Sequence, residues 1–454
     1  MVSIKFKKYL LDLGYSPDQI SQQLENNTFT YMLDVGVNRM YINYVYSRTE
    51  DQIFSTHLEY WNRNDVNVFI SVGDDKTYIL NAKEKPDKIL SEKVKIHTFN
   101  YGVNTTGFEK EKVREISKEF IDASYFFKFV SKKKKSIHTV DKDLLLNLIK
   151  LKSDLLSDTN EDILHLLILR CLFIKYLEDN AIYNAGTLVN ILKTNDPRKL
   201  IHAFDEIKKI NGDIFKYDKF KSTDLKPYYL YKLHQFFSSD YRTKQLPLFP
   251  YQFNRIPIQL ISHVYEAFLK SEPKKQKGIF YTPFFIVNFM LFHTIGKKLE
   301  SKKDITILDP AVGSGAFLVE CFRMILRAYS GNIDYCKKKE ILQNQLFGID
   351  IDRQALQIAT FSLYLALIET EKPEFIRQQI KNSHPILPSL IGKNLIEANA
   401  LTDDVFKNKT FDFIVSNPPW GSVKDTGDHE NLKERMAIES KGKIGTIPDY
   451  KNVS

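Results

Sequence analysis

Cysteine is scarce in this chain of 454 residues, and long apolar runs are missing. The three cysteines, Cys171, Cys321 and Cys336, are far apart, and no CxxC pair or histidine cluster accompanies them. This usage argues against a disulfide framework and a structural zinc site, and it is typical of a reducing cytoplasm. No stretch approaches the ~20 apolar residues of a membrane span, and the charged start of the chain does not resemble a signal peptide. We therefore expect a cytoplasmic protein with no metal and no membrane contact.

Basic residues are in excess, with a formal net charge of +9 and a pI near 9.0. This balance permits a nucleic acid as partner without proving one. The length suffices for two or three domains. Changes in sequence pattern predict a small mixed α/β domain at 1–105, a helical domain at 106–270 and a third domain at 271–454.

The first of these domains contains a predicted hairpin. The apolar runs at 66–72 and 76–82 flank a turn that holds Gly73, and residues 91–99 predict a third strand. Acidic residues at the turn, Asp74 and Asp75, raise the alternative of a nuclease. The second strand, however, has Asn81 where a metal-binding carboxylate is needed, so we favour a hairpin with an acidic turn.

After the helical middle of the chain, short apolar strands alternate with helices from about residue 304 onward. This alternation predicts a parallel sheet with helices on both faces, whose ligands bind where the strands end. The first strand is followed by "DPAVGSGAF" and a helix. Its glycines permit a tight turn and close backbone approach to a ligand, and the helix N-terminus faces that ligand. NAD, a nucleotide, S-adenosylmethionine or packing alone could explain this turn, but the phosphate-loop ending is missing.

Two further motifs are candidates for ligand binding, one at the end of the next strand and one at the start of a helix. Asp350 ends the strand "LFGID" and could accept both ribose hydroxyls of an adenosine. It lies 35 residues after Gly315, more than the ~20 of a dinucleotide-binding fold. Asp352 is interpreted as a helix N-cap. Upstream, "GIFYTP" ends in Thr282 and Pro283, which predict a capped helix start that could hold a carboxylate.

The last motif is "NPPW", which follows the strand "FDFIV". If the substrate is an exocyclic amine such as adenine N6, its hydrogens could bond to the Asn417 side-chain oxygen and the Pro418 carbonyl. The lone pair of the nitrogen would then be available to attack a sulfonium methyl. Trp420, one of two tryptophans in the chain, could stack on a flipped base with a gain of about 1–3 kcal/mol. Alone, the motif could also be a turn that ends the strand.

In this order the motifs resemble those of the DNA adenine N6-methyltransferases, in the subgroup of type I modification subunits and fused restriction-modification enzymes. The resemblance covers roughly residues 150–454. It implies a Rossmann-like class I methyltransferase core, S-adenosylmethionine as cofactor and DNA as partner. The implied catalytic residues are Asn417, Pro418, Pro419 and Trp420. The implied cofactor-binding residues are Phe280, Tyr281, Thr282, Asp309, Pro310, Ala311, Gly313, Ser314, Gly315, Phe317, Asp350, Ile351 and Asn399.

One departure from the family pattern lies at the C-terminus. Relatives of this type continue with further strands and a target recognition domain, whereas this chain ends 34 residues after Trp420. We therefore expect the core to be incomplete, with a second chain or a missing C-terminal segment supplying target recognition.

The resulting hypothesis is adenine N6 methylation of DNA in a restriction-modification or phage-defence system. The alternatives are methylation of RNA or of a protein glutamine, and a non-catalytic DNA-binding or assembly subunit that retains the cofactor fold.

Overall fold

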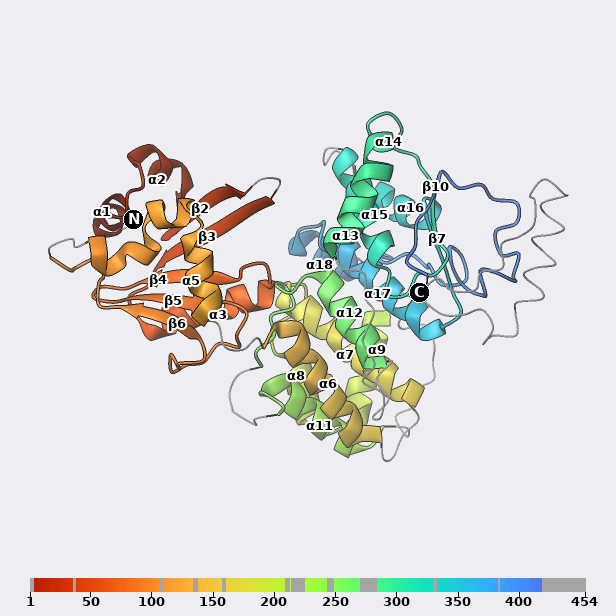
Figure 1. Cartoon of the computed structure of the whole chain (residues 1–454). Helices are drawn as coiled ribbons and strands as arrows, with labels where there is room; N and C mark the ends of the chain where they lie inside the picture. Colours follow the sequence, from red (N-terminus) through yellow and green to blue (C-terminus); the bar gives the residue numbers. More distant parts are fainter. Residues whose placement is uncertain are drawn as a thin grey trace, which may run out of the picture. The chain divides into compact units, whose positions relative to one another are not determined.

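The computed structural model describes most of the chain in two compact units. Unit 1 comprises residues 1–147 and the returning segment 239–257, and unit 2 comprises 148–238 and 258–454 (Figure 1). The predicted domain boundaries near residues 105 and 270 stay a prediction. The described residues are 4–35, 38–106, 110–133, 138–156, 161–208, 213, 225–242, 249–269, 284–329, 333–382 and 384–418.

Unit 1 is built on a sheet in the order β1-β2-β3-β4-β5-β6. Strands β3 and β4 pair in parallel through the crossover helix α3, and the other neighbours are antiparallel. One face packs against α3 through Ile53 and Tyr60, and the other packs against α1 and α5 through Phe6 and Phe126. The elements are α1 (Ile4–Asp12), α2 (Pro17–Gln23), β1 (Leu24–Glu25), β2 (Thr28–Val35), β3 (Asn38–Tyr46), α3 (Glu50–Arg63), β4 (Val68–Val72), β5 (Thr77–Asn81), β6 (Lys95–Phe99), η1 (Lys110–Ile116), α4 (Lys118–Asp122), α5 (Tyr125–Lys133) and, shared with unit 2, α6 (Val140–Leu155).

The predicted hairpin is confirmed, since β4 and β5 pair in antiparallel fashion and the Gly73 N–H donates to the Lys76 carbonyl over 2.8 Å. The acidic turn and Asn81 lie at opposite ends of β5, which spans roughly 16 Å. Lys83 donates to both oxygens of Asn64, the residue that ends α3. The turn carboxylates therefore do not meet Asn81 and Lys83, and this arrangement does not form the nuclease site considered above.

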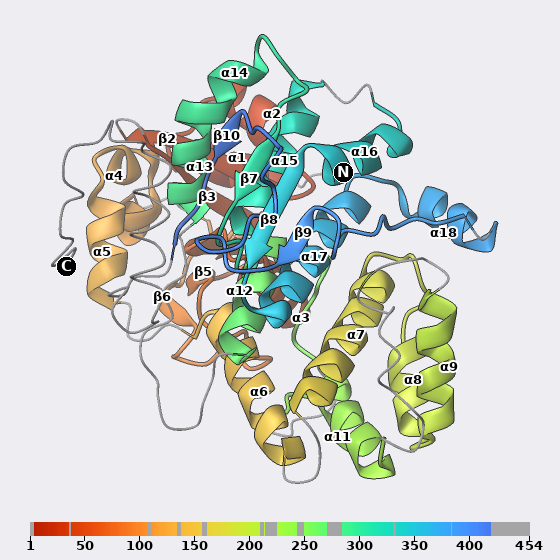
Figure 2. The same ribbon diagram turned by 90° about the vertical axis from the view of Figure 1, so that its right-hand side faces the viewer.

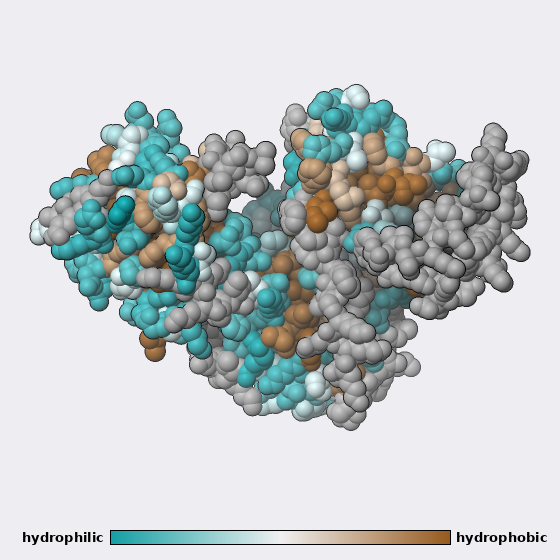
Figure 3. Space-filling view, viewed as in Figure 1, coloured by the Kyte–Doolittle hydropathy of each residue, from teal (hydrophilic) through white to brown (hydrophobic). Residues whose placement is uncertain are grey.

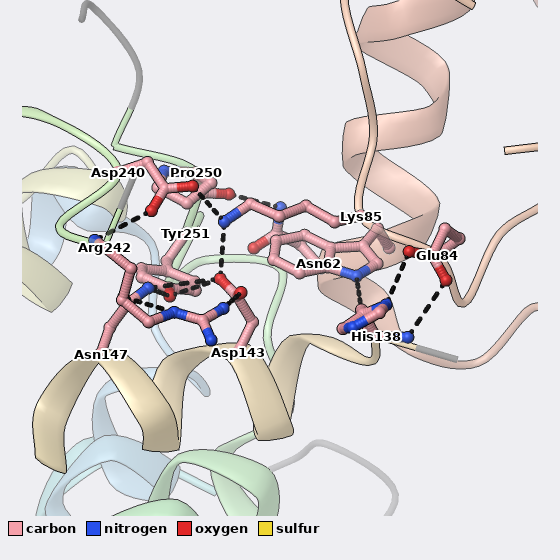
Figure 4. A network of polar contacts seen from close by, with 11 residues as sticks. Asn62, Glu84, Lys85, His138, Asp143, Asn147, Asp240, Arg242, Pro250 and Tyr251 are labelled. Carbon is pink, nitrogen blue, oxygen red and sulfur yellow. Dashed lines mark hydrogen bonds and ion pairs between the residues drawn. The ribbon is translucent and has the colours of Figure 1, made fainter. Parts of the chain in front are cut away.

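A buried ionic network holds the returning segment to the rest of unit 1 (Figure 4). Asp143 is 2 % exposed and accepts hydrogen bonds from Lys85 (2.7 Å), Tyr251 (2.8 Å) and Arg242. Lys85 also bonds Asp240 of the returning segment over 2.6 Å. Two cations thus face two carboxylates, which compensates the desolvation of the buried charges. Removing Asp143 would leave the Arg242 side chain without its carboxylate partner in this network and would remove one of the two partners of Lys85.

Unit 2 contains a helical layer that packs on a parallel sheet. Helix α17 is buried along almost its whole length, which is typical of a helix enclosed on all sides. It packs against α12 and, through Phe361, against Phe173 of α7. The helices are α7 (Glu161–Asp179), α8 (Thr187–Lys193), α9 (Pro197–Lys208), α11 (Pro227–Ser238), α12 (Ile258–Leu269), α13 (Phe284–Leu291), the π-helical turn η4 (Phe292–Gly296), α14 (Lys297–Leu299), α15 (Ala316–Ala328), α16 (Tyr335–Asn344), α17 (Arg353–Ile368) and α18 (Pro373–Lys381).

The sheet of unit 2 has the order β10-β7-β8-β9, and all its neighbours are parallel. Figure 2 shows these strands side by side, next to α15 and α17. The chain proceeds from β7 to β8 and β9 and then returns to the other side of β7, so the strand order reverses between β7 and β10. Ligands of such sheets bind outside the carboxyl ends of the strands at this switch point. The strands are β7 (Ile307–Asp309), β8 (Leu346–Asp350), β9 (Leu395–Glu397) and β10 (Phe413–Ile414).

The two faces of this sheet are covered differently. Helices α15, α16 and α17 contact its strands, whereas Leu308, Phe347 and Ile349 on the opposite face pack against Phe406 and Phe411 of the segment before β10. The helices expected on this second face do not occur among the described residues before β10. The parallel α/β core itself is confirmed.

Helix α13 contributes to the helical layer through its contact with α15. Its Val287 and Leu291 are buried, while Phe289 and Phe292 are each 66 % exposed along the same helical stretch. Figure 3 shows apolar surface gathered in the part of unit 2 where α13 lies. Within the described ranges, no helix is long and apolar enough to cross a membrane.

Candidate active site at the strand switch point

The glycine-rich turn connects β7 to α15. Gly315 is the N-cap of α15 with φ of +82°, a left-handed conformation that favours glycine. An added Cβ there would lie 3.0 Å from the Cα of Ala359 in α17. The turn is closed by hydrogen bonds from the Gly315 N–H to the Val312 carbonyl and from the Val312 N–H to the Ile349 carbonyl. The loop therefore lies against α17 and β8, with the N-terminus of α15 at the carboxyl edge of the sheet.

Asp350 ends β8, next to this turn. One carboxylate oxygen accepts the Gly313 N–H and the other accepts the Asp352 N–H, both over 2.9 Å. The Asp350 carboxylate thus holds the glycine-rich turn and the start of α17 at the end of β8. Asp352 caps α17 through the Gln354 N–H, as predicted. The side chain of Ile351, between the two acids, is 73 % exposed.

Asp309 ends β7 and is buried, with 1 % of its surface exposed. Its Oδ1 accepts hydrogen bonds from the Ser416 hydroxyl (2.8 Å) and the Ala311 N–H (3.1 Å). Burial raises the pKa of Asp309 to about 7, and the nearby carboxylate of Asp350 raises it as well, whereas the two hydrogen bonds lower it. A buried carboxyl of this kind at a strand switch point is a candidate for binding a cationic group.

The predicted catalytic segment follows β10. Val415 continues the ladder to β7 through its N–H, which donates to the Leu308 carbonyl over 2.9 Å. Because Ser416 bonds Asp309, Asn417 and Pro418 follow directly beside the glycine-rich turn. The predicted residues Phe280, Tyr281, Thr282, Pro419 and Trp420 lie outside the described residues.

Asn399 lies just after β9, where its side-chain oxygen accepts the Leu401 N–H over 3.0 Å. The adjoining Ala398 N–H donates to the Asp350 carbonyl over 3.0 Å. The turn after β9 is thus joined to the end of β8. The structure brings together at one sheet edge the predicted residues Asp309, Pro310, Ala311, Gly313, Ser314, Gly315, Asp350, Ile351, Asn399, Asn417 and Pro418, while Phe317 is buried in the first turn of α15. Their roles stay a prediction.

Sequence reasoning missed two serines that support the site. Ser362 of α17 donates toward the Ser314 carbonyl over 2.9 Å, and Ser262 of α12 contacts the Ser362 hydroxyl over 2.5 Å. Both are almost fully buried. They connect α12, the last described helix before the "GIFYTP" segment, to the glycine-rich turn. No local spacing signals this connection, because it joins residues 100 positions apart.

The buried Asp309 carboxyl predicts a pH-dependent stability. The folded protein holds a proton on Asp309 up to about pH 7, whereas an unfolded carboxyl loses it near pH 4, so stability falls as the pH rises between these values. We expect the wild type to lose about 3 kcal/mol relative to Asp309→Asn between pH 5 and 8. Urea unfolding at both pH values measures this difference. Asp205→Asn, an exposed control, should follow the wild type, and parallel profiles for Asp309→Asn would contradict the prediction.

No group of three or more His, Cys, Asp or Glu side chains that could hold a metal occurs in the described part of the chain. The groups at this edge include the carboxyls of Asp309 and Asp350, an amide and backbone N–H groups, while Arg353 at the start of α17 lies 3.7 Å from Glu397 at the end of β9. This edge fits a cationic, adenosine-containing ligand better than an anionic one. The fit rests on Asp309 and Asp350 at adjacent strand ends and on the glycine at position 315, where the turn has no Cβ.

The segment that forms this edge of the sheet is similar to proteins of known family. Residues 257–445 match the model of the N-6 DNA Methylase family. This segment is similar to members of that family. The resemblance inferred from the motifs is therefore confirmed for the part of the chain that carries them.

Named relatives of the methylase segment include restriction-modification proteins. The chain is 26 % identical over 326 residues to the type II restriction enzyme and methyltransferase RM.Eco57I of Escherichia coli, covering 60 % of this chain and 32 % of the relative. It is 23 % identical over 346 residues to DNA methyltransferase A of Bacillus subtilis, covering 66 % and 38 %. A solved structure of the type IIL restriction-modification enzyme MmeI in complex with DNA aligns with a TM-score of 0.48 at 20 % identity, over 67 % of this chain and 46 % of that one. The chain thus spans only about a third of the length of the first two relatives.

Proposed function

We propose that the chain transfers a methyl group from S-adenosylmethionine to N6 of a flipped-out adenine in DNA, as part of a restriction-modification or phage-defence system. The observation that carries this proposal is the meeting of four strand ends at the switch point. The hydrogen bond from Ser416 to Asp309 brings the Asn417 segment beside the turn that precedes α15. A cofactor site and an amine-binding loop are thereby adjacent.

The residues at this edge divide into those that would hold the cofactor and those that would hold the base. Asp350 would accept the ribose hydroxyls, and the turn at Gly313 and Gly315 would let backbone approach the ligand closely. The carboxyl of Asp309 would favour its positive charge. When bound, S-adenosylmethionine supplies an electrophilic methyl group on a sulfonium. As the family resemblance implies, Asn399 would lie near its adenine and Thr282 near its methionine part, and Phe280, Tyr281 and Ile351 would be further cofactor-binding residues.

The amine would be bound by acceptors alone. The Asn417 side-chain oxygen and the Pro418 carbonyl would take the two hydrogens of adenine N6, which concentrates the lone pair on a nitrogen otherwise conjugated into the ring. Pro418 and Pro419 have no N–H to offer, so only acceptors face the amine. Trp420 would stack on the flipped base. No strong general base is required, because the proton can leave after the methyl group has been accepted.

DNA is the proposed acceptor, and a further chain or segment is the proposed source of target recognition. The relatives named above are restriction enzymes or DNA methyltransferases, and the chain spans about a third of their length. The basic net charge of +9 is compatible with a polyanionic partner.

The acceptor can be tested directly. The purified chain, alone and with the product of the adjoining reading frame, is incubated with methyl-labelled S-adenosylmethionine and either unmethylated DNA, RNA or protein. We expect label in DNA only, recovered as N6-methyladenine by mass spectrometry. Label in RNA or in protein glutamine would replace the proposal by one of those acceptors. Cofactor binding by calorimetry without any transfer would favour a non-catalytic subunit.

A further inference from the structure

We propose that Ser416 is a positioning residue that couples cofactor binding to the placement of the Asn417 loop, the segment that follows Ser416 and starts with Asn417 and Pro418. This inference rests on the proposed function and adds to it a link between the two halves of the site. The link runs through the hydrogen bond from the Ser416 hydroxyl to the Asp309 carboxyl over 2.8 Å, which joins neighbouring strand ends.

The backbone ladder ends where this bond begins. The last ladder bond between β10 and β7 runs from the Val415 N–H to the Leu308 carbonyl. One residue later, the two strands are joined by a side-chain hydrogen bond, because the Ser416 hydroxyl donates to Asp309 at the end of β7. Among the described residues, the Ser416 side chain therefore ties the start of the Asn417 segment to the end of β7, one residue beyond the last backbone bond given above.

The acceptor of this bond is itself part of the proposed cofactor site. Oδ1 of Asp309 also accepts the Ala311 N–H of the glycine-rich turn over 3.1 Å. One oxygen atom thus joins the turn, the end of β7 and the Asn417 segment. A change in the charge of this carboxyl acts on both partners at once.

The strength of the bond depends on that charge, because a hydroxyl donates more strongly to a carboxylate than to a neutral carboxyl. Burial and the carboxylate of Asp350 at the end of β8 raise the pKa of Asp309 to about 7, so both forms are populated near neutral pH. Cys321 of α15 also lies near Asp309 in the helical layer. Burial raises the pKa of its thiol, and the charges of Asp309 and Glu320 raise it further. A cationic ligand favours the ionised form of Asp309 and thereby strengthens the Ser416 bond.

Coupling of this kind is reciprocal. A cofactor that ionises Asp309 fixes the Asn417 loop, and a base held by the loop increases cofactor affinity by the same factor. S-adenosylhomocysteine, which lacks the sulfonium charge, should fix the loop less well than S-adenosylmethionine.

The experiment uses Trp420 as a reporter of the loop. Trp61→Phe leaves Trp420 as the only tryptophan of the full chain, and this parent is compared with variants that also carry Ser416→Ala or Ser416→Thr. Emission of Trp420 is followed during titration with S-adenosylmethionine and with S-adenosylhomocysteine between pH 6 and 8, and affinity is measured by calorimetry. If Trp61→Phe does not fold, difference spectra of the chain with both tryptophans replace it.

In the parent we expect S-adenosylmethionine to change the emission more than S-adenosylhomocysteine does. Ser416→Ala should lose most of this change while its affinity at pH 8 stays within about 3-fold, and Ser416→Thr should retain the change. Because the Ser416 bond lowers the pKa of Asp309, its loss should move the pH midpoint of cofactor binding upward. An unchanged emission response and pH midpoint in Ser416→Ala would overturn the inference and leave the proposed function standing. Absence of cofactor binding in the parent would overturn the proposed function.

Discussion

Replacing Asn417 by alanine is expected to lower the rate of methyl transfer to DNA adenine by about 10²–10³-fold, the usual loss when one polar group that acts on the reacting atoms is removed. The Asn417 oxygen is proposed to accept one hydrogen of the amine, and alanine leaves that hydrogen without an acceptor. Cofactor affinity should change little, since the proposed cofactor contacts come from Asp350 and the glycine-rich turn. Transfer of labelled methyl and calorimetry measure the two effects separately.

A matched control lies in the segment before β10. Asn408 is exposed and precedes the strand that leads to Asn417, so Asn408→Ala removes the same side chain from the same stretch of chain. It should transfer methyl at the wild-type rate. Wild-type turnover in Asn417→Ala would contradict the proposed amine-binding role, whereas loss of cofactor affinity together with turnover would indicate that Asn417 supports the fold of the site.

The parallel sheet of unit 2 could be predicted because its signals are local. Apolar strands alternate with helices, and "DPAVGSGAF" and "FGID" mark two strand ends by glycine and acid alone. In unit 1 the pair β2 and β3 was not predicted. Both strands carry dense aromatic and β-branched residues that indicate strands, yet the sheet they enter also contains a parallel pair across α3, which only tertiary packing determines.

The supporting contacts of the site could not be predicted for a related reason. Ser416 was only the residue before a motif, and its bond to Asp309 joins positions 107 apart in the chain. Ser362 looked like one more residue of an apolar helix until its contact with the Ser314 carbonyl placed it under the glycine-rich turn. Motifs identify residues that face a ligand, whereas the residues that hold them are set by which strand ends become neighbours.

Replacing Asp350 by alanine is expected to weaken binding of S-adenosylmethionine by at least about 100-fold. Hydrogen bonds to a charged acceptor contribute about 1.5–3 kcal/mol each, and two ribose hydroxyls are proposed to bind this carboxylate. The same carboxylate holds the Gly313 and Asp352 N–H groups over 2.9 Å, so alanine also releases the turn. Asp352→Asn is the matched control, because asparagine preserves the N-cap of α17 and removes an acid two residues away. It should bind the cofactor within about 3-fold of the wild type.

Thermal stabilisation by the cofactor separates lost binding from lost folding in this pair of variants. At a concentration 100 times the dissociation constant, a ligand stabilises the folded state by about 2.7 kcal/mol, and a 100-fold weaker site gains only about 0.4 kcal/mol at the same concentration. Asp350→Ala should therefore unfold cooperatively without cofactor yet gain almost nothing from its addition, while Asp352→Asn gains as much as the wild type. If Asp350→Ala were stabilised as fully as the wild type, the ribose would have to be held elsewhere, and the acid at the end of β8 would serve only to close the turn between Gly313 and α17.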